Sequence, residues 1–206
     1  MTVRIKICGV THPDDARAAV DAGAALIGLN FVPGSPRCLD LRTAEAICNR
    51  VGGEVERVAV FRNAGPDEIA RVLRRMELER VQLHGSETEE DVEAVDLPVI
   101  KAIRGADLET AESFPGTLLL VDHPEEGGGS GKPWSWGDAS ELISRGFDVI
   151  LAGGLTPENV REALASLGDL LPWGVDVATG VEGPDRRKDP ARLAAFVRAV
   201  REETAG

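Results

Sequence analysis

The stretch Arg4-Ile5-Lys6-Ile7-Cys8-Gly9 decides the fold of this chain. Its alternating apolar, β-prone residues predict a strand that stops at the glycine. A helix signal follows at once, because Pro13 suits a first helical turn and Thr11 is a candidate N-cap. A strand that turns directly into a helix is typical of the first unit of a parallel β/α barrel. In such barrels the chemistry lies at the C-terminal strand ends, so Cys8 is a catalytic candidate.

Strand-like and helix-like runs alternate along the rest of the chain. Further strands are predicted at 25–31, 57–61, 80–83, 98–103, 117–122, 148–152 and 173–177. Helices are predicted at 13–22, 43–51, 66–76, 86–95 (with Ser86 as N-cap), 108–114, 137–145, 157–167 and 190–203. Apolar strands that alternate strictly with helices predict a parallel, eight-stranded (β/α)8 TIM barrel, a single domain over residues 1–206. The chain is short beside the ~250 residues typical of this fold, so its loops must be lean.

Composition limits the kinds of partner. Asp and Glu number 35 against 23 Lys and Arg, a net charge of −12, which disfavours nucleic acid and anionic membranes. The three cysteines have no metal-type spacing, which argues against a disulfide framework and a zinc site. They predict that the protein is located in the reducing cytoplasm. We expect no signal peptide and no membrane helix, since the first strand begins at once and no apolar run approaches ~20 residues.

Two strand ends carry reactive groups. Cys8 is either a small buried hydrophobe or a base, and as a base it must be a thiolate whose pKa its neighbours lower. Lys6 is not an obvious helper, because it lies deeper in the same strand face. Asp122 closes a run of apolar residues and is either a helix cap or an acid; no helix starts directly after it, which favours the chemical role.

Other candidates are more ambiguous. His84 and Asp176 also lie at strand ends, and for His84 a structural hydrogen bond is as reasonable as substrate contact. Arg37 follows two prolines in a stiff loop, where a held guanidinium suits a carboxylate, although most loop arginines are only solvated. Cys38 and Cys48 are interpreted as packing residues.

Glycine-bearing turns follow the last two strands. Gly153-Gly154 and Thr179-Gly180 lie where barrels of this type bind phosphate, since glycines let backbone amides approach an anion. The alternative is that these glycines only form turns. Two such turns at the two expected strands favour phosphate binding.

Taken together, several motifs resemble the phosphoribosylanthranilate isomerase family of tryptophan biosynthesis, in the same order from first strand to last helix. The matching stretches are Lys6-Ile7-Cys8-Gly9-Val10-Thr11, Ser35-Pro36-Arg37, Val81-Gln82-Leu83-His84-Gly85, Gly128-Gly129-Ser130-Gly131-Lys132, Ala152-Gly153-Gly154-Leu155 with Pro157-Glu158-Asn159-Val160, and Gly174-Val175-Asp176-Val177. Each piece alone is common, but the combination is highly specific.

The resemblance implies a cofactor-free and metal-free Amadori rearrangement of N-(5-phosphoribosyl)anthranilate to 1-(2-carboxyphenylamino)-1-deoxyribulose 5-phosphate. It implies Cys8 as general base, Asp122 as general acid and Arg37 as ligand of the anthranilate carboxylate. His84 and Asp176 are candidate substrate-binding residues whose roles the sequence leaves open. The phosphate would be held by Gly129, Gly131, Gly153, Gly154, Thr179 and Gly180. The expected partner is a phosphorylated small molecule, and the chain is expected to be a monomer or a homodimer.

Three departures from the family pattern stand out. Ala178-Thr179-Gly180 replaces the common Ser-Ser-Gly, and Trp134-Ser135-Trp136 replaces Phe-Asp-Trp, while Asn30 adds a polar group at an otherwise apolar strand end. Two rivals stay open: a histidine-pathway aminoaldose isomerase, which has Asp in place of Cys8 and two similar halves, and a phosphate-binding barrel without catalysis.

Overall fold

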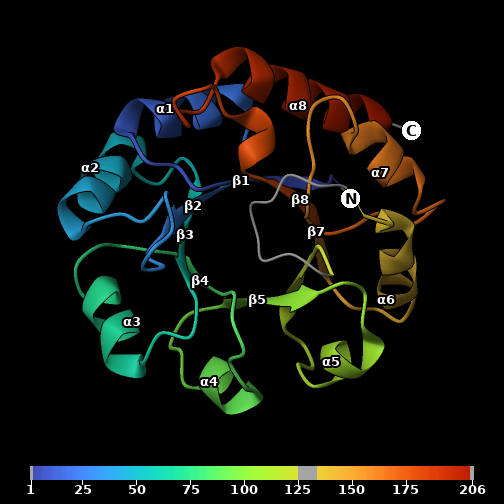
Figure 1. Ribbon diagram of the computed structural model, residues 1–206, viewed down its shortest axis with the longest axis horizontal. Helices are drawn as coiled ribbons and strands as arrows, with labels where there is room; N and C mark the ends of the chain where they lie inside the picture. Colours follow the sequence, from blue (N-terminus) through green and yellow to red (C-terminus); the bar gives the residue numbers. More distant parts are fainter. Residues whose placement is uncertain (1, 125–133, 205–206) are drawn as a thin grey trace.

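The computed structural model describes residues 2–124 and 134–204, and within them eight parallel strands close into a barrel in chain order. The strands are β1 (Arg4–Cys8), β2 (Leu26–Asn30), β3 (Glu56–Phe61), β4 (Arg80–Leu83), β5 (Val99–Arg104), β6 (Leu118–Asp122), β7 (Val149–Leu151) and β8 (Gly174–Val177). β1 pairs with both β2 and β8, which closes the ring. The predicted fold class is confirmed, and Figure 1 shows the helices as an outer ring around the strands.

The connecting helices are α1 (Pro13–Ala22), α2 (Leu41–Val51), α3 (Pro66–Leu73), α4 (Glu89–Glu93), α5 (Leu108–Glu112), α6 (Ser140–Ser144), α7 (Val160–Ala165) and α8 (Pro190–Glu203), with 3-10 turns η1 (Trp136–Ala139) and η2 (Thr179–Val181). Five of the eight helices within the described residues, α3 to α7, are shorter than predicted. Helices α1 and α8 have the predicted bounds at both ends, and α2 begins two residues earlier than predicted. Among the described residues, no helix is long and apolar enough to cross a membrane.

Two predicted N-caps are wrong. His12, rather than Thr11, caps α1, because its Nδ1 accepts from the Asp14 amide. Thr88, rather than Ser86, caps α4, where Thr88 and Asp91 exchange hydrogen bonds in a capping box. A reciprocal pair satisfies two free amides at once, which explains why the helix begins later than the first available serine.

Alternation along the strands separates two environments. Ile5 and Ile7 of β1 lie in the core between barrel and helices, whereas Arg4, Lys6 and Cys8 lie on the opposite face, toward the barrel interior. The middle of that interior is apolar. It is packed by Leu26, Val58, Ile100, Ala102, Leu118, Leu120, Ile150 and Ala152. This layer separates two polar ends of the barrel.

Candidate active site

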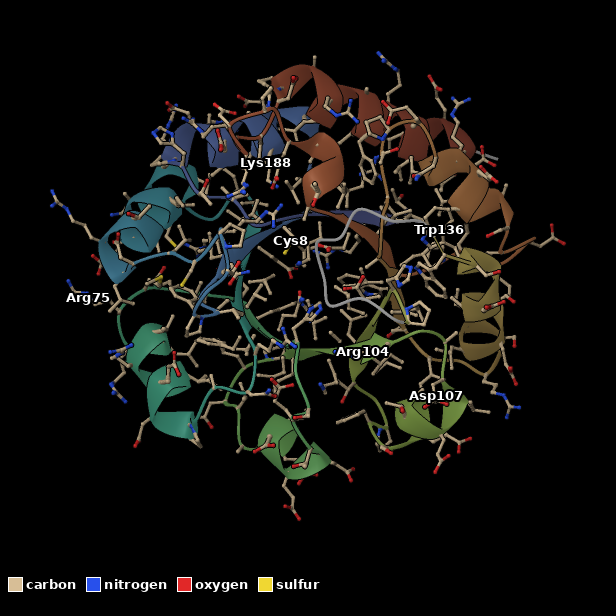
Figure 2. All side chains as sticks on the ribbon, viewed as in Figure 1. Cys8, Arg75, Arg104, Asp107, Trp136 and Lys188 are labelled. Atoms are coloured by element: carbon tan, nitrogen blue, oxygen red, sulfur yellow. The ribbon has the colours of Figure 1, made fainter. Side chains whose placement is uncertain are left out.

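A cavity of about 380 Å³ opens at the C-terminal ends of the strands and gathers most of the predicted site. Its lining includes Cys8, Arg37, His84, Asp122, Asp176, Gly153, Gly154, Thr179 and Gly180. Cys8 lies near the centre of the barrel in Figure 2. Gly129 and Gly131 fall outside the described residues. Residues from both ends of the sequence therefore meet in one place.

The thiol of Cys8 has a cationic neighbour that the sequence did not suggest. Lys6 is buried, its Nζ lies 2.7 Å from Oδ1 of Asp176, and its positive charge acts on the Cys8 thiol. Our expectation that Lys6 lies too deep to help Cys8 is wrong, because a lysine side chain is long enough to reach from one layer to the next. Gly28 makes room for this contact: a Cβ there would lie 2.9 Å from Sγ and 3.2 Å from Nζ.

Burial and the neighbouring ammonium groups shift the pKa of Cys8 in opposite directions. Burial raises the pKa of the Cys8 thiol above its usual value, while the ammonium groups of Lys6 and Lys188 act in the other direction. Burial by itself would lower the pKa of Lys6, but the negative charge of Asp176 and contact with Cys8 raise it, so the lysine stays charged. Without that fixed positive charge, forming a thiolate here would cost far more.

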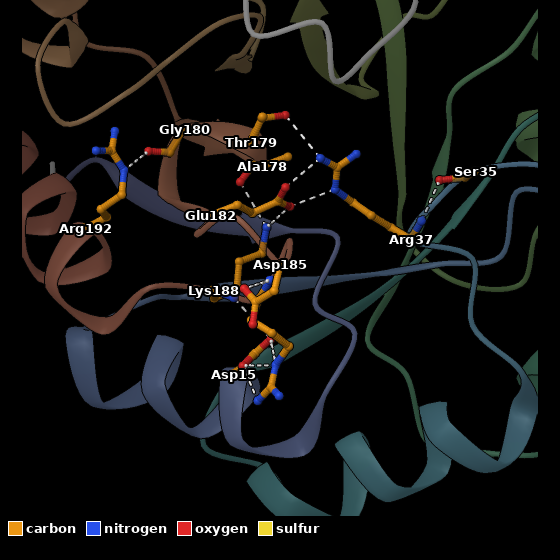
Figure 3. Close-up of polar contacts among 11 residues, drawn as sticks. Asp15, Ser35, Arg37, Ala178, Thr179, Gly180, Glu182, Asp185, Lys188 and Arg192 are labelled. Atoms are coloured by element: carbon orange, nitrogen blue, oxygen red, sulfur yellow. Dashed lines mark hydrogen bonds and ion pairs between the residues drawn. The ribbon is translucent and has the colours of Figure 1, made fainter.

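Arg37 belongs to a buried ion cluster (Figure 3). Its Nε and Nη2 donate to the two carboxylate oxygens of Glu182 at 2.7 and 2.8 Å, and Nη2 also donates to Thr179 at 3.2 Å. Lys188 donates to the same carboxylate at 2.8 Å and to the Ala178 carbonyl at 2.9 Å. The guanidinium is thus held rigidly at the cavity edge.

The sequence did not point to Glu182 and Lys188. Lys188 ends a short basic run, Arg186-Arg187-Lys188, which is flanked by Asp185 and Asp189. In the structure its side chain is buried, and burial lowers its pKa despite the neighbouring Glu182. No spacing rule would have joined a loop after the eighth strand to Arg37, 145 residues away.

Asp122 is held from two sides. Its Oδ1 accepts from the His123 backbone amide at 2.8 Å, and its Oδ2 lies 3.2 Å from Nε2 of His84. His84 is in turn bonded through Nδ1 to Nε2 of Gln82 at 2.8 Å. His84 thus bonds Gln82 and lies beside Asp122 in the cavity wall, and its contact with substrate stays a prediction.

The glycine turns have no room for side chains. Gly153 and Gly154 have φ of +80° and +72°, and a Cβ on Gly153 would approach the Trp134 indole nitrogen to 2.8 Å. A Cβ on Gly180 would collide with the Leu155 carbonyl oxygen. These constraints hold for a turn and for a phosphate loop alike, so phosphate binding here stays a prediction.

Both tryptophans of the departing Trp134-Ser135-Trp136 motif have a structural role. The indole of Trp134 donates to the Ala152 carbonyl at 2.9 Å, and that of Trp136 to the Gly153 carbonyl at 3.0 Å. They satisfy the carbonyls at the end of β7, where the chain leaves the sheet for its glycine turn. The sequence analysis did not predict these two hydrogen bonds.

The remaining candidates have simpler roles. Asn30 accepts a 2.7 Å hydrogen bond from the Val32 amide, which turns the chain into the loop that carries Arg37. Cys48 is buried as predicted, but Cys38 is exposed, so its assignment to packing is wrong. Within residues 2–124 and 134–204, no three His, Cys, Asp or Glu side chains are grouped as metal ligands.

Comparisons with known proteins agree with this geometry. A family model described as N-(5'phosphoribosyl)anthranilate (PRA) isomerase matches residues 5–199. The chain is 43% identical to an N-(5'-phosphoribosyl)anthranilate isomerase of Myxococcus xanthus, over 98% of this chain and 97% of that one.

Two solved structures have the same fold over nearly their whole length. Phosphoribosylanthranilate isomerase from Thermotoga maritima is similar with a TM-score of 0.89 and 35% identity, covering 98% of this chain and 100% of that one. A phosphoribosylanthranilate isomerase in complex with reduced 1-(o-carboxyphenylamino)-1-deoxyribulose 5-phosphate is similar with a TM-score of 0.87 and 32% identity, with the same coverage.

Proposed function

This chain belongs to the N-(5'-phosphoribosyl)anthranilate isomerase family of tryptophan biosynthesis and is an isomerase, and from that membership we propose its detailed mechanism. Cys8 is the general base and Asp122 the general acid in the conversion of N-(5-phosphoribosyl)anthranilate to 1-(2-carboxyphenylamino)-1-deoxyribulose 5-phosphate. One observation carries the proposal. The two groups come from β1 and β6, on nearly opposite sides of the ring, and line the same cavity.

The reaction needs a proton donor and a proton acceptor on either side of the sugar. Asp122 gives a proton to the furanose ring oxygen, and the C–O bond at C1 breaks as the nitrogen lone pair forms a protonated imine. Cys8 as thiolate removes the hydrogen from C2, giving an enolamine. A proton then adds to C1 while the C2 hydroxyl loses one, which restores both residues and leaves an isomer of the substrate. Acid and base assistance of this kind each supply ~10²–10⁴-fold.

The groups behind the two residues suit these roles. The ammonium of Lys6, kept charged by Asp176, faces the sulfur that must become negative. His84 and the His123 amide hold the carboxyl group of Asp122 in one orientation. A base and an acid fixed in this way lose little entropy on reaching the transition state.

We assign the anthranilate carboxylate to Arg37 and the phosphate to the turns that follow β7 and β8. Glu182 holds Nε and Nη2 of Arg37, and in this proposal Nη1 binds the carboxylate of the substrate. Gly154 and Thr179-Gly180 lie on the same cavity wall. The cytoplasmic location and the oligomeric state, monomer or homodimer, stay predictions.

A turnover assay tests the function. The fluorescence of phosphoribosylanthranilate should fall on addition of the protein, and mass spectrometry should find a product of unchanged mass with a ketose carbonyl. A folded protein that binds phosphate compounds without turnover would leave only the non-catalytic binding barrel. Turnover of the histidine-pathway aminoaldose in place of phosphoribosylanthranilate would favour that isomerase instead.

A further inference from the structure

Gln82 on β4 carries a buried amide that packing does not explain. The residue is 1% exposed, and among the described residues its Oε1 has no hydrogen-bond partner. A buried carbonyl without a hydrogen bond destabilises the fold, and a leucine or methionine would fill the same space without that cost. An interior position that retains such a group is a candidate for a role in the neighbouring site.

The other end of the amide contacts His84. Gln82 lies on β4 and His84 follows the last residue of that strand, and Nε2 of Gln82 is 2.8 Å from Nδ1 of His84. A neutral imidazole has one donor nitrogen and one acceptor nitrogen. With the amide nitrogen facing it, as the side chain is placed here, Nδ1 would accept and the ring proton would sit on Nε2. The reverse amide orientation would put Oε1 against Nδ1 and the ring proton there.

The ring proton faces the proposed acid. Nε2 of His84 is 3.2 Å from Oδ2 of Asp122, whereas Oδ1 already accepts the His123 amide. Oδ2 is therefore the oxygen at which Asp122 either accepts a hydrogen bond from His84 or donates its own proton to the ring. Which of the two occurs depends on the ring nitrogen that carries the proton, and hence on the amide of Gln82.

We propose that Gln82 is a positioning residue that keeps the ring proton of His84 on Nε2 and thereby sets how Asp122 holds its proton. The inference rests on the proposed role of Asp122 as general acid. It assigns to an interior residue of β4 a function in a reaction whose acid lies on β6.

Ring-nitrogen NMR on the whole chain tests, without any substrate, whether Gln82 sets the ring proton of His84. The chain has three histidines, so long-range ¹H–¹⁵N spectra of their rings are simple to assign with a His84→Asn variant. The wild type should show His84 with its proton on Nε2. Gln82→Leu should lose that preference, and Gln82→Glu, which only accepts, should place a proton on Nδ1. An unchanged His84 signal in Gln82→Leu would overturn the proposal.

A matched control guards against a general packing effect. Ile100 on β5 is paired in register with Gln82 and is also buried, but it makes no contact with His84 through a polar group. Ile100→Val should therefore leave the His84 spectrum as in the wild type. A change of ring proton in this control equal to that in Gln82→Leu would contradict a specific role of the amide.

Steady-state kinetics test whether Gln82 also affects proton donation by Asp122. In Gln82→Leu and Gln82→Glu we expect kcat to fall ~10-fold or more with KM nearly unchanged, as for a disturbed general acid. An altered ring proton with wild-type kcat would disprove the link to Asp122. If the wild type itself fails to turn over phosphoribosylanthranilate, the proposed function fails, but the NMR result on Gln82 and His84 still stands or falls separately.

Discussion

The two ends of the barrel are built from the same strands but differ in how their charged and polar groups are paired. β1 places Arg4 at the N-terminal end and Cys8 at the other, and β4 likewise places Arg80 and His84 at opposite ends. At the N-terminal end, Glu56 accepts from Arg4 at 2.6 Å and from Arg80 at 2.7 Å. Both arginines therefore share one carboxylate.

Trp173 completes the N-terminal end. The guanidinium carbons of Arg4 and Arg80 lie 4.6 and 5.5 Å from the centroid of its ring. At the C-terminal end, by contrast, the half-buried Cys8 feels the positive charge of Lys6 and Lys188, and Gln82 keeps an oxygen without a hydrogen-bond partner among the described residues. The comparison teaches that one end is arranged for stability, whereas the other keeps costly groups that the proposed mechanism uses for proton transfer.

The largest expected effect concerns the two reacting groups. Cys8→Ala and Asp122→Asn should each lower kcat by ~10²–10⁴-fold, because each removes one proton-transfer partner. Steady-state kinetics and a melting curve check this, with Cys48→Ala as a control that removes a different buried cysteine. Near-normal turnover in Cys8→Ala or Asp122→Asn would remove that residue from the mechanism.

A smaller effect is expected when the cation behind the thiol is removed. Lys6→Met should slow alkylation of Cys8 by iodoacetamide at neutral pH and lower kcat roughly 10-fold, because the thiolate loses its nearest positive charge. Since burial already raises the pKa of Cys8, wild-type kcat/KM should rise with pH toward the alkaline side, and the variant profile should lie further in that direction.

The opposite end of the same strand provides the control for that experiment. Arg4→Met, on the same face of β1, should leave the alkylation rate unchanged, and a Cys38→Ser background removes the exposed thiol from the measurement. Equal slowing in Lys6→Met and Arg4→Met would show that the thiol responds to loss of stability and not to the contact with Lys6.

Removal of the guanidinium at the cavity edge should act on binding. Arg37→Ala should raise KM roughly 10- to 100-fold, as expected for loss of a charge-assisted hydrogen bond, with a lesser change in kcat. Glu182 then keeps Lys188 as its partner, so the fold should survive. An unchanged KM would disprove the assignment of the substrate carboxylate to Arg37.

At the N-terminal end the expected effects are on stability alone. Glu56→Gln should lower the free energy of unfolding by about 1–2 kcal/mol at pH 7 without a change in kcat. Burial opposes the charge of Glu56, but hydrogen bonds from Arg4 and Arg80 outweigh it and hold its pKa below the usual value. A lowered pKa stabilises the fold above the unfolded value of ~4.3.

That stabilisation is lost as the pH falls through the pKa of the folded state. The difference in unfolding free energy between wild type and Glu56→Gln should therefore shrink in acid, which urea titrations at several pH values measure. A difference that stays constant down to strongly acidic pH would contradict an ionic role for Glu56.

The smallest effect on stability is expected when the indole of Trp173 is removed. Trp173→Leu should cost about 1 kcal/mol, since each cation–π contact at a partly exposed site contributes ~0.5–1 kcal/mol. Thermal unfolding measures this loss, and kcat should be unchanged. A fall in kcat comparable to that of Lys6→Met would mean that the two ends of the barrel are coupled.

Periodicity was sufficient for the fold but not for the interior contacts. The order of strands and helices follows from local hydrophobic patterns, and the strand-end rule correctly brought Cys8 and Asp122 to one cavity. Helix limits failed where a longer-range or reciprocal bond decided them, as with Thr88 and Asp91. Pattern rules describe the face on which a residue lies, but not how far its side chain reaches.

The amino-acid sequence by itself determined the closed eight-stranded barrel and the end at which the reactive groups lie, because both depend on alternation within single elements. Only the tertiary structure decided which groups touch: Lys6 with Cys8 and Asp176, Glu182 with Arg37, and Gln82 with His84. Each of these contacts depends on side-chain length and on the free space left by neighbouring strands, such as that above Gly28. Those quantities exist only once the ring has closed.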